Sequence, residues 1–186
     1  MIENQEFEKV DFTRNPLKMD EYDNCTFVNC NFENQNLANF NFVDCQFVDC
    51  NLSLIEISNT AFKTVHFNNC KLLGVDFSGC NSFLLNMNFD SCFMNLTSFY
   101  QLKFKQKSFL NCTLHEADFT ETDLTESKFN DCDLKRAIFE RTTLIKTDFT
   151  TASNFNIDPE SNKMKGAKFS RSTLAGLLSK HRLVIN

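Results

Sequence analysis

The chain has 186 residues, enough for one domain, with 22 Phe, 9 Cys and no Trp, and a formal net charge of −5 at pH 7. The acidic balance excludes a nucleic-acid-binding protein of the basic-patch kind, and no apolar run approaches the roughly 18 residues of a transmembrane helix. The stretch MIENQEFEKVDF (1–12) lacks the basic start and apolar core of a signal peptide, so we expect a cytoplasmic protein.

A five-residue apolar period runs through most of the chain. Every fifth residue from Phe7 to Phe77 is large and apolar, and the spacing resumes from Leu84 to Phe149 after a two-residue frame shift within residues 78–83. A helix needs a period near 3.6 and a strand a period of 2, so neither explains the pattern. The period predicts a chain that turns a corner every five residues.

A longer period of twenty residues, lengthened to 22 once at the frame shift, appears in two residue types. Four five-residue sides make one square coil, so the sequence predicts a solenoid of about seven to eight coils, roughly 35–40 Å long at the spacing of β-strands. The large residue of each side and the small residue two before it should point inward. The two columns are Phe27, Phe47, Phe67, Phe89, Phe109, Phe129 and Phe149, and Cys30, Cys50, Cys70, Cys92, Cys112 and Cys132.

The cysteines are spaced by five or twenty residues, unlike the paired cysteines two to four apart that open zinc sites. Their odd number and a reducing compartment disfavour disulfides. We interpret them as small core residues and expect no metal site and no cofactor. The three histidines, His66, His115 and His181, are scattered, and no nucleophile–base pair is evident. We therefore expect no catalytic residue and no enzymatic activity.

Two departures interrupt the repeat. We interpret the frame shift within residues 78–83 as a small bulge at a corner. Lys107 occupies an inward, small-residue position, where an unpaired ammonium is costly, so we expect a local distortion that lets it reach solvent.

The repeats are expected to fill residues 1–154, and residues 155–186 to form a linker, a short helix and a tail. Pro159 breaks the pattern, and Ser172 or Thr173 is placed to cap the helix. Two roles remain open for the apolar residues that follow: covering the last coil, or joining two copies in a homodimer. These residues are Leu174, Leu177, Leu178, Leu183, Val184 and Ile185.

The stretches HEADFTETDLTESKF (115–129) and TDFTTASNF (147–155) resemble the pentapeptide-repeat family, whose pattern is A(D/N)LXX. The resemblance implies an all-β fold, a right-handed quadrilateral β-helix. The C-terminal stretches IDPE (157–160), KFS (168–170), LL (177–178) and LVI (183–185) are similar to the end of a narrower group. That group comprises the quinolone-resistance (Qnr-type), mycobacterial fluoroquinolone-resistance, and microcin- and albicidin-immunity proteins. This second resemblance implies a tail-to-tail homodimer and a DNA mimic that binds DNA gyrase or topoisomerase IV and gives tolerance of a topoisomerase poison.

A DNA mimic needs outward carboxylates, and residues 116–133 contain seven acids against one base, Lys128. The alternative is an ordinary solvated face, with the rod serving as an interaction scaffold for a protein other than a topoisomerase. Residues 163–186 contain six bases and no acid, so the expected dimer centre is positive. The chain also lacks the long second loop of many quinolone-resistance proteins. The predicted partner-binding residues are Glu56, Asp76, Glu116, Asp118, Glu121, Asp123, Glu126, Asp131 and Asp133.

Overall fold

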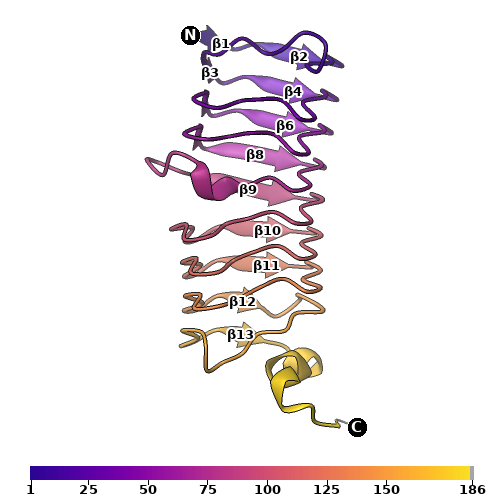
Figure 1. Ribbon diagram of the computed structural model, residues 1–186, viewed down its shortest axis with the longest axis vertical. Helices are drawn as coiled ribbons and strands as arrows, with labels where there is room; N and C mark the ends of the chain where they lie inside the picture. The colour runs from indigo at the N-terminus through magenta and orange to yellow at the C-terminus, as the bar shows by residue number, and fades with distance from the viewer. Residues whose placement is uncertain (185–186) are drawn as a thin grey trace.

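A computed structural model describes residues 1–184 of the chain, which form one rod of stacked coils (Figure 1). The N-terminus lies at one end of the rod and two short 3-10 helices lie at the other (Figure 1). The elements are β1 (Ile2–Glu3), β2 (Glu6–Glu8), β3 (Glu21–Asp23), β4 (Thr26–Val28), β5 (Asn41–Val43), β6 (Gln46–Val48), β7 (Ala61–Lys63), β8 (Val65–Asn68), η1 (Phe77–Gly79), β9 (Met87–Asp90), β10 (Ser108–Leu110), β11 (Lys128–Asn130), β12 (Asp148–Phe149), β13 (Lys168–Phe169), η2 (Arg171–Leu177) and η3 (Ser179–His181).

One side of the rod is a parallel sheet of nine strands, from β2 to β13. Its register joins residues twenty apart, such as Phe27 and Phe47, and residues 22 apart where Phe67 pairs with Phe89. The square coil read from the sequence is therefore confirmed, and the fold is a right-handed quadrilateral β-helix. Nine stacked strands correspond to about eight coils, about 38 Å of rod at the usual strand spacing. A second sheet, β1-β3-β5-β7, forms another side in the N-terminal coils.

The phenylalanine column forms the centre of the core. Consecutive rings stack nearly parallel, as for Phe109 and Phe129, whose centroids lie 4.8 Å apart at an angle of 5°. Rings on adjacent sides meet edge to face, as for Phe109 and Phe119 at 86°. Aromatic pairs favour both arrangements. The Phe rings of the square core therefore make favourable edge-to-face contacts within a coil and stacked contacts between coils.

All nine cysteines are free and buried, which confirms their interpretation as core residues. The thiol of Cys50 donates a hydrogen bond to the Phe27 carbonyl oxygen of the preceding coil at 3.3 Å. On another side, the Thr60 hydroxyl donates to the Leu37 carbonyl at 2.6 Å. The small inward position therefore supplies a donor for a buried carbonyl, and Cys or Thr can serve there.

We expect the nine thiols to be unreactive in the folded protein. All nine are buried, so a reagent cannot reach them. At Cys45, burial also raises the pKa of the thiol to about 12, which disfavours the reactive thiolate form. Titration with Ellman's reagent at pH 8 should detect almost none of the nine thiols in the native protein and all of them in guanidinium chloride. Rapid native reaction of several thiols would contradict the packing described above.

The corners place non-glycine residues at positive φ two positions after most central residues, a conformation that Asn and Asp tolerate best. In the N-terminal coils these residues are mostly Asn or Asp, such as Asn29, Asn34 and Asp44. In the C-terminal coils they are longer, such as Glu121 and Arg141. The longer side chains reach the neighbouring coil, as Arg141 does where it contacts Glu121.

The frame shift produces a projecting loop, slightly later in the chain than expected. Ala61 pairs with Asn81, twenty residues on, whereas Val65 pairs with Met87, 22 residues on. The two extra residues therefore lie between Asn81 and Met87. The expectation that Leu84 points inward is wrong, since its side chain is 63% exposed and its φ is 58°. The segment between η1 and β9 stands out from the side of the rod (Figure 1).

The parallel ladder continues past residue 154, where the repeats were expected to end. β13 pairs with β12, and the Phe169 ring stacks on Phe149 at 5.3 Å. The short C-terminal helix is of the 3-10 type and begins at Arg171, with Ser170 rather than Ser172 or Thr173 at the N-cap position and no capping side-chain hydrogen bond. None of the helices in residues 1–184 is long and apolar enough to cross a membrane.

Candidate functional site: the charged faces of the rod

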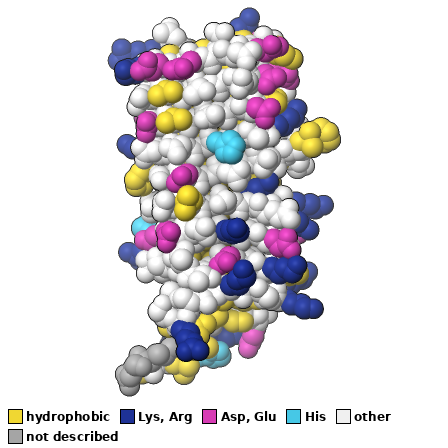
Figure 2. Space-filling model, turned by 180° about the vertical axis from the view of Figure 1, so that it is seen from behind, with side chains coloured by type: hydrophobic (Ala, Val, Ile, Leu, Met, Phe, Trp, Pro, Cys, Tyr) yellow, Lys and Arg dark blue, Asp and Glu magenta, His cyan; other side chains and the backbone are white. Residues whose placement is uncertain are grey.

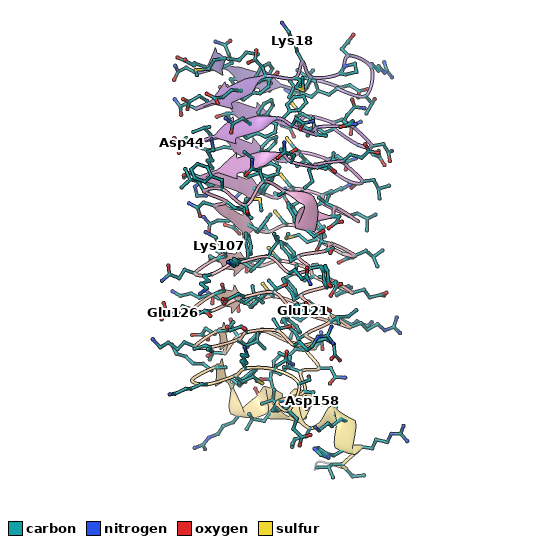
Figure 3. The ribbon with its side chains drawn as sticks, turned by 60° about the vertical axis from the view of Figure 1, so that its left-hand side comes forward. Lys18, Asp44, Lys107, Glu121, Glu126 and Asp158 are labelled. Carbon is teal, nitrogen blue, oxygen red and sulfur yellow. The ribbon has the colours of Figure 1, made fainter. Side chains whose placement is uncertain are left out.

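The predicted acidic column exists on the outer surface. The backbone of Asp76 bridges to that of Ser98, and Ser98 bridges to Asp118, one coil further each time. Glu121 and Glu126 lie on the outside of the C-terminal coils, as Figure 3 shows. The stacked coils thus bring Asp76 and Asp118, which are 42 residues apart in the sequence, to one side of the rod.

Three predicted carboxylates at the corners are paired with bases of the next coil. Glu121 contacts Arg141 at 2.7 Å and Glu126 contacts Lys146 at 2.9 Å. Glu116 lies 3.5 Å from Arg136. These exposed pairs add little stability, but they neutralise carboxylates that were expected to be free.

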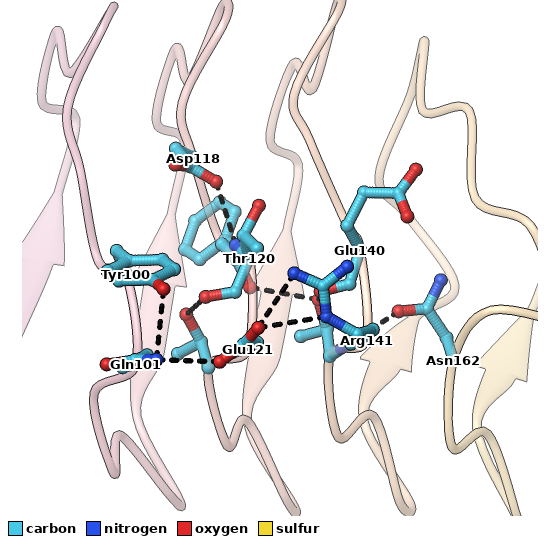
Figure 4. Close-up of polar contacts among 11 residues, drawn as sticks. Tyr100, Gln101, Asp118, Thr120, Glu121, Glu140, Arg141 and Asn162 are labelled. Carbon is cyan, nitrogen blue, oxygen red and sulfur yellow. Dashed lines mark hydrogen bonds and ion pairs between the residues drawn. The ribbon is translucent and has the colours of Figure 1, made fainter.

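Glu121 belongs to a ladder of side chains along one corner (Figure 4). The Gln101 amide donates to Glu121 at 2.7 Å and also contacts the Tyr100 hydroxyl at 3.0 Å. The hydrogen bond from Gln101 and the neighbouring Arg141 guanidinium lower the pKa of Glu121. The carboxylate therefore stays ionised but has its charge and acceptor sites occupied within the rod.

The remaining predicted acids divide into three groups. Asp123 pairs with Lys105 at 3.1 Å and Asp133 with His115 at 2.8 Å. Asp76 and Asp118 accept hydrogen bonds from backbone N–H groups two residues on, at 2.9 and 2.8 Å. Within the described part of the chain, the carboxylates of Glu56 and Asp131 take part in no ion pair and no hydrogen bond, although the Asp131 N–H donates to the Thr151 hydroxyl at 2.8 Å.

The bases in these pairs were missed in the sequence, although a signal for them was present. Arg136, Arg141 and Lys146 each lie twenty residues after their glutamate, the same period that defines the Phe and Cys columns. The carboxylates are evident from their density along the chain. Their basic partners become evident only when residues twenty positions apart are compared.

Charge is divided unequally along the rod. Residues 1–100 contain 13 acids and 5 bases, a formal charge of −8, and residues 101–186 contain 11 acids and 14 bases, a formal charge of +3. Among contacts between the described residues 1–184, only Glu8, Asp11 and Asp20 of the first-half acids are in ion pairs. In the second half eight of eleven acids are paired. On the face in Figure 2, Asp and Glu gather over the N-terminal coils, and Lys and Arg are more frequent below. The acidic surface thus belongs to the N-terminal coils.

Lys107 finds a partner at the inward position where it was expected to cause a distortion. Its side chain is half-buried, and its ammonium donates to the Asn86 side-chain carbonyl at 2.7 Å. The same group lies 5.8 Å from the centre of the Phe104 ring. Burial lowers the pKa of Lys107. Asn86 lies in the segment that contains the two extra residues, so this contact ties the projecting loop to the next coil.

We expect Asn86→Ala to destabilise the protein by about 1–3 kcal/mol, because it leaves a half-buried ammonium without its acceptor. The double variant with Lys107→Met should recover most of this loss, since it removes the unpaired charge as well. Urea unfolding of the wild type, both single variants and the double variant measures the coupling. Additive effects of the two substitutions would show that the contact carries no energy.

The C-terminal helices cover part of the last coil. The Ile157 N–H donates to the Gly176 carbonyl at 3.0 Å, and a Cβ at Gly176 would lie 2.4 Å from the Phe155 carbonyl oxygen. Lys180 of η3 pairs with Asp158 at 2.8 Å, the residue labelled near this end in Figure 3. The chain can approach so closely only because residue 176 has no side chain.

The six apolar residues predicted to cover the end or to join two copies have different environments. Leu177 packs against the core. Leu174, Leu178, Leu183 and Val184 are exposed, Val184 by 89%. Ile185 lies outside the described residues.

Two apolar surfaces were not expected from the sequence. Leu54, Leu73, Phe93 and Leu96 are exposed, and a hollow of about 270 Å³ is lined by Leu73, Phe93 and Lys71. Phe83 and Leu84, at the tip of the projecting loop, form the second surface. Across residues 1–184, no three His, Cys, Asp or Glu side chains are grouped as a metal site would need.

Comparison with known proteins agrees with this architecture. A family model described as a pentapeptide repeat region matches residues 21–83 and 81–149. The full-length structure of QnrB1, a plasmid-mediated fluoroquinolone resistance protein, is similar with a TM-score of 0.64 and 16% identity, covering 97% of this chain and 99% of that one. A trypsin-treated variant of QnrB1 gives a TM-score of 0.65 and 15% identity, covering 99% and 98%. No curated protein matches the sequence. At this identity, the similarity to the solved structures supports the fold alone. The repeat model covers most of the sequence, and the chain therefore belongs to the pentapeptide repeat family.

Proposed function

We propose that the protein is a non-enzymatic, protein-binding rod whose N-terminal coils imitate duplex DNA and occupy a DNA-binding groove of DNA gyrase or topoisomerase IV. Binding would give tolerance of, or immunity to, a topoisomerase poison. The proposal places the protein in the cytoplasm, where its nine free thiols would stay reduced. The observation that carries the proposal is the unequal division of charge, with ten unpaired carboxylates in the first half of the rod.

The charge density of the N-terminal coils supports this assignment. Residues 1–100 form about five coils, about 24 Å of rod at the usual strand spacing. Duplex DNA carries one charge per ~1.7 Å of axis, about 14 charges over that length. The 13 acids of these coils are close to this value, and the net charge of −8 is a little over half of it. The C-terminal half, with a formal charge of +3, has no such resemblance to DNA.

We also propose a homodimer that forms through the exposed apolar residues at the C-terminal end, Leu174, Leu178, Leu183 and Val184. A dimer joined at these ends would place its two acidic halves at opposite ends of a longer rod. The bases of residues 163–186 would lie near the junction, away from the cationic groove of the partner. Sedimentation at micromolar concentration tests the dimer, and a monomer there would leave the tail with only its covering role.

A gyrase supercoiling assay with purified protein, with and without a fluoroquinolone or a peptide poison, tests the proposed function. We expect inhibition of supercoiling at high protein concentration and fewer poison-induced cleavage products at lower concentration. A direct binding measurement should accompany it. No inhibition, no protection and no binding together would refute the proposal.

The second candidate function is an interaction scaffold for a protein other than a topoisomerase. The exposed apolar cluster of Leu54, Leu73, Phe93 and Leu96 favours it, because clusters of this kind often mark contacts with proteins. Replacement of Phe93 by Ser should abolish capture of such a partner and leave topoisomerase binding unchanged.

A further inference from the structure

The projecting loop and the next coil border an open hollow of about 730 Å³. Its size falls within the range of small-molecule sites, so it can hold one or two side chains of a larger ligand. One wall is the loop itself and the opposite wall is the stretch that follows Phe99. The residues that matter for its chemistry are Ser78, Ser82, Phe83, Tyr100, Gln101 and Lys103.

The hollow is held by specific contacts on both walls. The Phe83 N–H donates to the Asn81 side-chain oxygen at 2.9 Å, and Asn86 accepts from Lys107 at 2.7 Å. On the other wall, the Tyr100 hydroxyl is held by Gln101 at 3.0 Å. A loop anchored at both ends presents its apolar tip at a low entropic cost of binding.

The apolar side chains of the loop are unusually exposed. Phe83 is 68% exposed and Tyr100, across the hollow, 40%. Hydrophobic side chains stand out from the rod at the height of this loop in Figure 2. The rod buries its other Phe side chains almost completely, apart from Phe93 and the end coils. Two exposed aromatic rings therefore line a hollow of mixed polar and apolar character that is open to a ligand.

The charge of the hollow defines what it would accept. None of its lining residues is acidic, and Lys103 is the one charged residue among them. Lys103 is exposed and has no ion pair within residues 1–184, whereas Lys105, two residues on, is paired with Asp123. An occupant therefore needs an apolar group for the aromatic cleft and one carboxylate for Lys103.

We propose that this hollow is a docking site for an acidic, apolar segment of a partner protein. An aromatic or aliphatic side chain of the segment lies between Phe83 and Tyr100, and an adjacent carboxylate pairs with Lys103. The hollow lies at the C-terminal border of the acidic half, but it takes a negatively charged ligand, whereas the acidic coils would take a positively charged one. The proposal therefore does not depend on topoisomerase binding.

Single-stranded nucleic acid also combines flat rings with negative charge, but the surroundings disfavour it. A nucleic acid strand needs a basic groove that follows several phosphates, and only one lysine lines the hollow. One carboxylate on a peptide suits a single lysine better than a chain of phosphates.

The chain contains a built-in reporter for the test. It has two tyrosines and no tryptophan, and Tyr22 is buried while Tyr100 lies in the hollow. The probe is a labelled peptide of about ten residues that alternates Glu with Leu and Phe, with a second peptide carrying Gln in place of Glu. Fluorescence anisotropy measures affinity, and the change in tyrosine emission with unlabelled peptide reports the location.

We expect the acidic peptide to bind, to change the emission of the wild type, and to leave the emission of Tyr100→Phe unchanged. Lys103→Glu and Phe83→Ser should each weaken binding about tenfold or more, and Lys165→Glu, an exposed lysine outside the hollow, by less than about twofold. Thermal unfolding confirms that the variants are folded. The proposal fails if the peptide does not bind at millimolar concentration, if both lysine variants have equal effects, or if an oligothymidylate binds more tightly than the peptide.

Discussion

A variant that lacks four carboxylates of the N-terminal coils should bind gyrase more than tenfold more weakly than the wild type. The substitutions are Glu33→Gln, Asp44→Asn, Asp49→Asn and Glu56→Gln. All four residues are exposed, and none forms an ion pair with any residue that the structure describes, so the fold should be retained. Asn also tolerates the positive φ of residues 44 and 49. The variant halves the formal charge of residues 1–100, from −8 to −4.

The matched control removes four charges from the C-terminal coils, through Glu116→Gln, Glu121→Gln, Glu126→Gln and Asp131→Asn. Three of these carboxylates are already paired with bases, so binding should change by less than about threefold. Surface plasmon resonance at several salt concentrations measures both variants. Affinity of the wild type should fall as salt screens the charges, and the salt dependence should be shallower for the N-terminal variant. Equal losses in the two variants would contradict the proposed orientation.

Truncation of one central ring should have the largest effect on stability. Phe109→Ala should lower the free energy of unfolding by about 3–5 kcal/mol, because it removes a fully buried ring and leaves a cavity. The ring stacks on Phe89 at 5.3 Å and on Phe129 at 4.8 Å. In a solenoid each coil is stabilised by its two neighbours. The truncation therefore weakens the packing of the coil that contains Phe109 against both adjacent coils.

Phe7→Ala is the control for this prediction. Phe7 lies in the first coil, is only half-buried, and stacks on a single ring of its column, Phe27, at 4.8 Å. Its truncation should cost clearly less than that of Phe109. Chemical unfolding followed by far-UV circular dichroism measures both variants. Equal losses of unfolding free energy in the two variants would mean that contacts with two neighbouring coils stabilise a ring no more than contacts with one.

The charge pattern shows how sequence reasoning can detect residues and still misjudge their role. The acidic stretch of residues 116–133 was the clearest one along the chain, yet five of its seven carboxylates are paired. Ion pairing in a solenoid acts between coils, so a local count of charges misses it. The unpaired acids of the N-terminal coils are more widely spaced in sequence and less conspicuous there.

The sequence by itself determined the architecture, because stacked coils repeat one environment every twenty residues and so impose a period on residue choice. Phe47, Cys50 and their equivalents could be placed in the core without coordinates. The tertiary structure alone decided where the pattern breaks. Leu84 fits the five-residue period but is exposed, since the two extra residues are accommodated after Asn81 and Leu85 packs against the core instead. The tertiary structure also decided which carboxylates are without an ion-pair partner. The bases that neutralise Glu121 and Glu126 come from the next coil, and only the stacking of coils brings them into contact.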